Sequence, residues 1–102
     1  MLPLIEAHRA EITELCRRFH VRRLEVFGSA ARGTDFDPAR SDVDLLVSHL
    51  PEHHPDIGSY LDLQDALADL LGRKVDLVME GAVENPYVRA GIERSRQPLY
   101  GS

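Results

Sequence analysis

Two aspartates stand two residues apart at a place where their spacing could do chemistry. Asp42 and Asp44 lie in the segment SDVDLLV (41–47), whose apolar, partly β-branched end favours a strand. Residues two apart in a strand project from the same face, so the two carboxylates lie side by side. Carboxylates this close repel each other unless a cation lies between them, and paired oxygen ligands suit Mg²⁺. The pair therefore predicts a magnesium site.

A glycine and a serine precede this pair at the end of another apolar segment. The run LEVF (24–27) stops at Gly28-Ser29, and the next residues, AAR (30–32), can begin a helix. A helix that starts there directs its free amide groups, and the positive end of its dipole, at whatever lies in front of Gly28 and Ser29. This predicts a phosphate site. Arg32 either adds a positive charge to that site or forms a structural ion pair.

A third aspartate lies in the segment VDLVM (75–79), which predicts another strand. Burial of a lone carboxylate in such an apolar strand costs several kcal/mol unless the carboxylate is paired or holds a metal. Alternation puts Asp76 on the face opposite its apolar neighbours, so it can converge with the first two aspartates if the strands are adjacent. The alternative interpretation is a structural salt bridge to Arg73 or Arg32.

Together these residues would form a two-metal centre for phosphoryl or nucleotidyl transfer. Asp42 and Asp44 would bridge two Mg²⁺ ions, and Asp76 would complete the shell of the ion that activates an attacking hydroxyl. Gly28 and Ser29 would hold the β- and γ-phosphates, so that pyrophosphate leaves in line with attack at the α-phosphorus.

Three predicted amphipathic helices pack against these strands and position them. The first begins at Pro3 and has an apolar stripe that includes His8, which we interpret as a satisfied residue at the edge of the core. The second is capped by Asp56 and ends at Gly72. The third begins at Asn85-Pro86 and ends near Arg96. The predicted inward residues of the second and third helices are Ile57, Tyr60, Leu61, Leu63, Leu67, Leu70, Leu71, Tyr87, Val88 and Ile92.

This order of elements predicts an α/β (α+β) fold, in which helices pack on a small mixed sheet of about three to four strands. The 102 residues are expected to form a single domain, 1–102, because the length allows only one modest core. The polar residues Asp35, Asp37, His53 and His54 are interpreted as solvated loop residues outside the site.

Charge, cysteine content and hydropathy indicate which classes of protein the chain can belong to. The net charge of −5 argues against a domain that coats nucleic acid phosphates, although a basic cluster at 17–23 is either a solvated helix end or a contact patch for an acidic partner. The single cysteine, Cys16, cannot form an intramolecular disulfide and is interpreted as a buried hydrophobe. The sequence contains no signal peptide and no membrane-spanning run, so we expect a cytoplasmic protein.

The ordered combination of Gly28-Ser29, Arg32-Gly33, Asp42-x-Asp44 and a later single aspartate resembles the signature of DNA polymerase beta-like nucleotidyltransferases. The chain resembles in particular the minimal nucleotidyltransferase (MNT) domains, many of which are antitoxins of HEPN-domain toxins. The resemblance covers about residues 4–100. It implies that Asp42, Asp44 and Asp76 are the catalytic and metal-binding residues, that ATP is the donor substrate, and that AMP is transferred.

The acceptor is less constrained. The resemblance implies a tyrosine of a partner HEPN toxin, and a chain this small must take its acceptor from another molecule. Transfer to a small molecule such as an aminoglycoside is an alternative in the same enzymatic class. A third alternative is a binding module that neutralises a toxin by complex formation alone. Homo-oligomers and hetero-oligomers are both compatible with the sequence.

Overall fold

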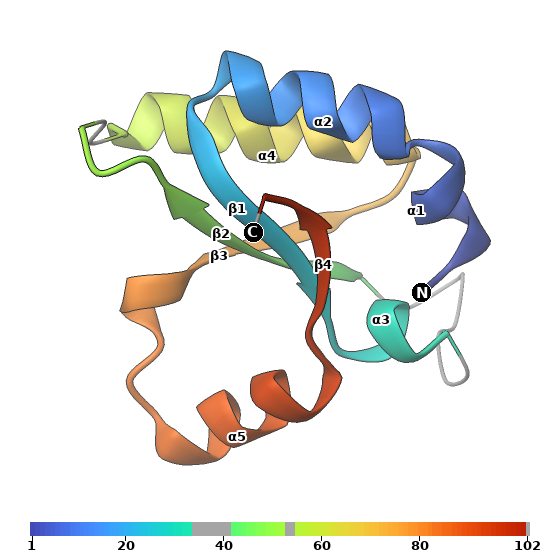
Figure 1. The fold of residues 1–102 in the computed structure, drawn as a ribbon, viewed down its shortest axis with the longest axis vertical. Coiled ribbons are helices and arrows are strands. Elements are labelled where there is room, and N and C mark those ends of the chain that lie inside the picture. Colours follow the sequence, from blue (N-terminus) through green and yellow to red (C-terminus); the bar gives the residue numbers. More distant parts are fainter. Residues whose placement is uncertain (34–41, 53–54, 102) are drawn as a thin grey trace.

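A mixed sheet forms the centre of the protein in a computed structural model, which describes residues 1–33, 42–52 and 55–101 (Figure 1). Within these residues four strands pair in the order β3-β2-β1-β4. The strands are β1 (Val21–Phe27), β2 (Val43–His49), β3 (Val75–Met79) and β4 (Gln97–Tyr100). Strand β1 is antiparallel to both β2 and β4, whereas β2 and β3 are parallel. The predicted mixed sheet is confirmed.

Helices lie on both faces of this sheet. They are α1 (Pro3–Ala7), α2 (Arg9–Arg18), α3 (Ser29–Arg32), α4 (Ile57–Leu71) and α5 (Pro86–Ser95), with a short 3-10 turn, η1 (Glu80–Ala82). Figure 1 shows α2 and α4 side by side across one face and α5 on the other side of the sheet. The core forms under α2 and α4, where Cys16, Leu67 and Leu45 of β2 are fully buried members of one apolar cluster.

Local signals set the helix ends as the sequence predicts. The Asp56 carboxylate accepts a hydrogen bond from the Ser59 amide at 2.7 Å, and Gly72 ends α4 in the left-handed conformation with φ 64°. The Asn85 side chain likewise accepts from the amides of Tyr87 and Val88 at the start of α5. These bonds satisfy amide groups that have no partner inside the helix.

Two expectations about the helices are wrong. The first predicted helix is two helices, because the chain bends at His8, which has φ −108° and whose Nδ1 lies 2.9 Å from the Leu4 carbonyl. That contact confirms the interpretation of His8 as satisfied. The other expectation placed several apolar side chains inward that are exposed instead, namely Ile57 (78%), Leu61 (46%), Tyr87 (86%) and Val88 (50%).

The outer edge of β3 is covered by α4. The Tyr60 hydroxyl donates to the Leu77 carbonyl, and the Leu77 amide donates to Gln64 Oε1 at 3.2 Å. Exposed edge strands offer unpaired backbone groups to other chains, and these two side chains satisfy one residue of that edge. They also fix the strand that carries Asp76.

Two further expectations from the sequence concern membrane-spanning segments and the loop residues outside the site. Within the described residues, no helix is both long and apolar enough to cross a bilayer. Asp35, Asp37, His53 and His54 lie outside the described residues.

Candidate active site

The register of the sheet brings two of the three predicted aspartates together on one face, whereas Asp42 lies just before β2 begins at Val43. Asp44 of β2 is the direct partner of Asp76 in the parallel pair with β3, so the two side chains leave the sheet on the same side. Across the other edge of β2, Phe27 is the partner of Asp44, and Gly28 follows directly. We call residues 28–31 the Gly28 turn. The surface that carries Asp44, Asp76 and this turn is called the aspartate face.

Gly28 lies against Asp44 in a way that leaves no room for a side chain. A Cβ atom on Gly28 would lie 2.8 Å from Asp44 Oδ2. The backbone of Gly28 also has φ 71°, a conformation that residues with a Cβ atom rarely adopt. Both observations explain why glycine stands here, since the chain must turn sharply while its backbone touches a carboxylate.

The turn after Gly28 offers unpaired donors. Helix α3 has only four residues, so the helix dipole that the sequence suggested is small, and the phosphate interpretation depends on individual groups instead. Among the described residues, the amides of Ser29 and Ala30 donate to no acceptor, and the Ser29 side chain is partly exposed. Arg32 ends α3 and is exposed. Two amides and a hydroxyl are donors suited to phosphate oxygens.

Repulsion among the carboxylates is visible in the pKa of Asp44. Burial, followed by the charges of Asp76 and then Asp42, raises the pKa of Asp44 to about 6. The Asp42 side chain is 38% exposed, and its carboxylate lies 4.0 Å from the exposed Lys74 ammonium. The charges of Asp76 and Asp42 thus act on Asp44 in the same direction, toward its neutral form.

This donor set fits Mg²⁺ in its chemistry, because it offers three carboxylates and Mg²⁺ prefers oxygen ligands. In the conformation that the described residues adopt, no three His, Cys, Asp or Glu side chains approach closely enough to hold a metal ion. Asp44 and Asp76 nevertheless leave the sheet on the same side at directly paired positions, which is where two ligands of one ion could come from. The assignment of the metal ligands stays a prediction.

The raised pKa of Asp44 predicts a pH dependence of stability in metal-free protein. The folded state binds the proton more tightly than the unfolded state, so this contribution to stability is complete below about pH 4 and is lost as the pH rises through about 6. The unfolding free energy of wild type minus that of Asp44→Asn should therefore fall over this range. Denaturant titrations in EDTA at several pH values measure it, and a difference that stays constant would contradict the proposed environment of Asp44.

Comparison with known protein families identifies the family of this chain. A family model described as "Nucleotidyltransferase domain" matches residues 10–99. The chain belongs to the nucleotidyltransferase domain family. It is therefore an enzyme of the nucleotidyltransferase type, as the sequence motif predicted.

Two curated relatives and one solved structure show how much of this nucleotidyltransferase is shared. "Putative protein adenylyltransferase MJ0128" of Methanocaldococcus jannaschii is 38% identical over 90 residues, which are 88% of this chain and 85% of that protein. "Protein adenylyltransferase MntA" of Thermococcus cleftensis is 39% identical over 82 residues, 80% of this chain and 76% of that protein. The fold also matches a chain in the structure of a tri-AMPylated Shewanella oneidensis HEPN toxin in complex with MNT antitoxin. The TM-score is 0.68 and the identity is 20%, and the match covers 96% of this chain and 73% of that chain.

One sequence expectation about Asp76 is wrong. The apolar run around it predicted a buried carboxylate, but Asp76 is exposed, while Val75 and Leu77 on the opposite face are buried. The reason is that β3 is an edge strand of the sheet, and Val75 and Leu77, not Asp76, lie on its buried face. The placement of Asp76 beside Asp44 therefore does not depend on a cost of burial.

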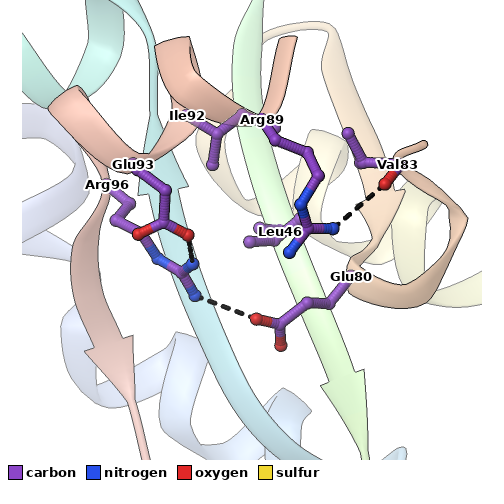
Figure 2. A pocket seen from close by; sticks show the side chains of 7 residues that line it. All are labelled: Leu46, Glu80, Val83, Arg89, Ile92, Glu93 and Arg96. Carbon is purple, nitrogen blue, oxygen red and sulfur yellow. Dashed lines mark hydrogen bonds and ion pairs between the residues drawn. The ribbon is translucent and has the colours of Figure 1, made fainter. Parts of the chain in front are cut away.

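Sequence analysis missed the ion pairs on the same face of the sheet. Glu25 of β1 is only 7% exposed and accepts from Arg96 Nε at 2.9 Å. Arg96 also contacts Glu80 at 3.1 Å and Glu93, and Figure 2 shows its guanidinium between these two acids. The hydrogen bond from Arg23 and, after it, that from Arg96 outweigh burial and lower the pKa of Glu80 below its usual range. An acid in the middle of the apolar run 24–27 was the available signal that a buried partner must exist.

The cavity beside these ion pairs is not a nucleotide site. It lies between α5 and β2 (Figure 2), and its volume is about 10 Å³, close to the space that one water molecule needs. A cavity of this size cannot admit a nucleotide.

Two arginines of the basic cluster form ion pairs, and Cys16 lies in the core. Arg17 pairs with Glu14 at 2.8 Å on the exposed end of α2, and Arg23 pairs with Glu80 at 2.8 Å. Cys16 is fully buried, and burial raises the pKa of its thiol to about 12. This confirms the interpretation of Cys16 as a small buried hydrophobe.

Proposed function

We propose that this nucleotidyltransferase transfers AMP from Mg·ATP to a tyrosine hydroxyl of a partner HEPN toxin and thereby acts as an antitoxin. The observation that carries the proposal is the contact of the Gly28 backbone with Asp44, with Asp76 in register beside it. This arrangement puts donors for phosphate next to carboxylates for a metal. That combination is what nucleotidyl transfer requires.

Each residue then has a distinct role. Asp42, Asp44 and Asp76 would hold two Mg²⁺ ions, which would supply positive charge to neutralise the triphosphate and to favour deprotonation of the acceptor hydroxyl. The Ser29 hydroxyl and the free amides of the Gly28 turn bind the β- and γ-phosphates. Arg32 adds a positive charge at the end of α3. The acceptor oxygen forms a bond to the α-phosphorus while the bond to the bridging oxygen breaks and pyrophosphate leaves.

The exposure of Asp76 supports a protein acceptor. Asp76 lies on an edge strand and its side chain is open to solvent, so the acceptor can approach from outside the domain. The relatives supply the rest of the argument, since two are named protein adenylyltransferases and the structurally similar complex pairs an MNT antitoxin with an AMPylated HEPN toxin. We place the protein in the cytoplasm as a hetero-oligomer with such a partner, without direct nucleic acid binding.

Ser29→Ala tests the phosphate part of the proposal. The hydroxyl is one donor among several, and a hydrogen bond to a charged group contributes about 1.5–3 kcal/mol. We expect Mg·ATP to bind at least about tenfold more weakly, with an unchanged melting temperature. Calorimetric titration measures this, and unchanged affinity would move the phosphate site elsewhere. Ser59→Ala, a serine of α4 whose side chain is also partly exposed, is the matched control.

The position of a radioactive label tests the reaction. The protein is incubated with a HEPN partner, Mg²⁺ and ATP labelled at either the α- or the γ-phosphate. We expect the α-label on the partner and the γ-label in pyrophosphate. Transfer of the γ-label would make the protein a kinase, and no transfer of either label to the partner would contradict the proposal.

A further inference from the structure

Ser95, the last residue of α5, joins this helix to the Gly28 turn. Its side chain is buried, with the residue 8% exposed, and its Oγ accepts a hydrogen bond from the Gly28 amide at 2.9 Å. The same hydroxyl donates to the Gly91 carbonyl at 3.1 Å, one turn earlier in α5. The hydroxyl thus accepts from a residue 67 positions away in the sequence and donates within its own helix.

Two neighbouring bonds hold the same turn. Gln97 at the start of β4 donates from Nε2 to the Ala31 carbonyl at 3.3 Å, and the Leu2 amide donates to the Ala30 carbonyl at 3.1 Å. Both alanines are fully buried. A helix of four residues has little stability of its own. The position of the Gly28 turn is therefore set by segments from both ends of the chain.

The end of α5 is itself fixed. Arg96, directly after Ser95, pairs with the buried Glu25 and with Glu80, and Figure 2 shows the contact with Glu80. Glu25 belongs to β1, the strand that leads into Gly28. The Ser95 hydroxyl therefore extends from a rigid support, which a positioning group requires.

Gly28 also lies close to the Asp44 carboxylate, since a Cβ atom added to Gly28 would be 2.8 Å from Asp44 Oδ2. We infer that Ser95 is a positioning residue for nucleotidyl transfer: its hydroxyl sets the distance between the Gly28 turn and the Asp44 carboxylate. This inference deepens the proposed function and rests on it for the role of the turn. Ser95 acts in this inference through the Gly28 amide, because its own side chain is buried.

Two measurements test the inference, and the first needs no nucleotide. Hydrogen exchange of the Gly28 amide, followed by NMR, should be at least about tenfold faster in Ser95→Ala, because loss of one hydrogen bond changes a local equilibrium by about that factor. Mg·ATP should also bind about tenfold more weakly. Ser95→Thr, which keeps the hydroxyl, should restore both values toward wild type, and Ser59→Ala on α4 should change neither.

The outcomes separate this inference from the proposed function. Unchanged exchange of Gly28 in Ser95→Ala would overturn the inference, and so would faster exchange with wild-type nucleotide affinity. A wild-type protein that binds no Mg·ATP would instead overturn the proposed function, and the exchange measurement would still decide whether Ser95 holds the turn. If Ser95→Ala does not fold, Gln97→Ala takes its place, because Gln97 is exposed and supports the same turn. It should weaken Mg·ATP binding in the same direction, and unchanged affinity would count against the inference.

Discussion

Asp44→Asn should yield a folded protein whose rate of AMP transfer has fallen at least about 10²–10³-fold, the loss that follows removal of one electrostatic group from an active site. Asp44 lies at the centre of the aspartate face, between the Gly28 turn and Asp76. The amide keeps the shape of the side chain but cannot supply the negative charge that a metal ligand needs. A transfer assay at saturating Mg²⁺ measures the loss.

The same substitution should leave stability equal or higher in the absence of metal. Burial and two neighbouring acids make ionised Asp44 unfavourable, as its pKa of about 6 shows. Removing the charge should raise the free energy of unfolding at pH 7 by about 1 kcal/mol, a value reduced for partial exposure to solvent. Asp62→Asn, the same change on the exposed side of α4, is the control and should alter neither quantity. An unfolded Asp44→Asn protein, or one with wild-type activity, would contradict the assignment.

Asp76→Asn should separate an enzyme from a binding module. If Asp76 serves only the acceptor side, the variant should still bind Mg·ATP through Asp42, Asp44 and the Gly28 turn. Its transfer rate should fall by at least about 10², the contribution of a positioned base or its equivalent. Titration of nucleotide and single-turnover transfer measure the two effects on the same preparation.

In a cell that carries the toxin, Asp76→Asn should lose protection while the complex still forms. The change removes one charge and leaves the surrounding strand intact, since Val75 and Leu77 keep the opposite face of β3 buried. Co-purification with the toxin and growth of the strain are measured together, with wild type and Asp62→Asn as controls. Full protection by Asp76→Asn would show that complex formation alone neutralises the toxin.

The elements with local signals were predictable from sequence. The bounds of β3 agree with the run VDLVM (75–79), and both ends of α4 follow from Asp56 and Gly72. Each of these signals is a bond or a backbone conformation within a few residues of the boundary. The shared face predicted for Asp42 and Asp44 stays a prediction, because β2 begins at Val43 and Asp42 precedes it.

The remaining features depend on residues far apart in the chain. The bond from Gly28 to Ser95 and the pair of Glu25 with Arg96 could not be inferred, because no local pattern links their partners. Helical periodicity also identified more apolar side chains than the sheet can cover. It cannot say which part of a stripe meets another element, so Ile57 and Tyr87 were placed inward although both are exposed.

The mass of the partner toxin tests the central proposal most directly. A HEPN toxin is co-expressed with wild type or with Asp44→Asn, purified as the complex, and its intact and peptide masses are measured. We predict that the toxin gains the mass of AMP on a tyrosine with wild type and gains none with Asp44→Asn. An unmodified toxin that is nevertheless neutralised by the wild-type protein would contradict the account.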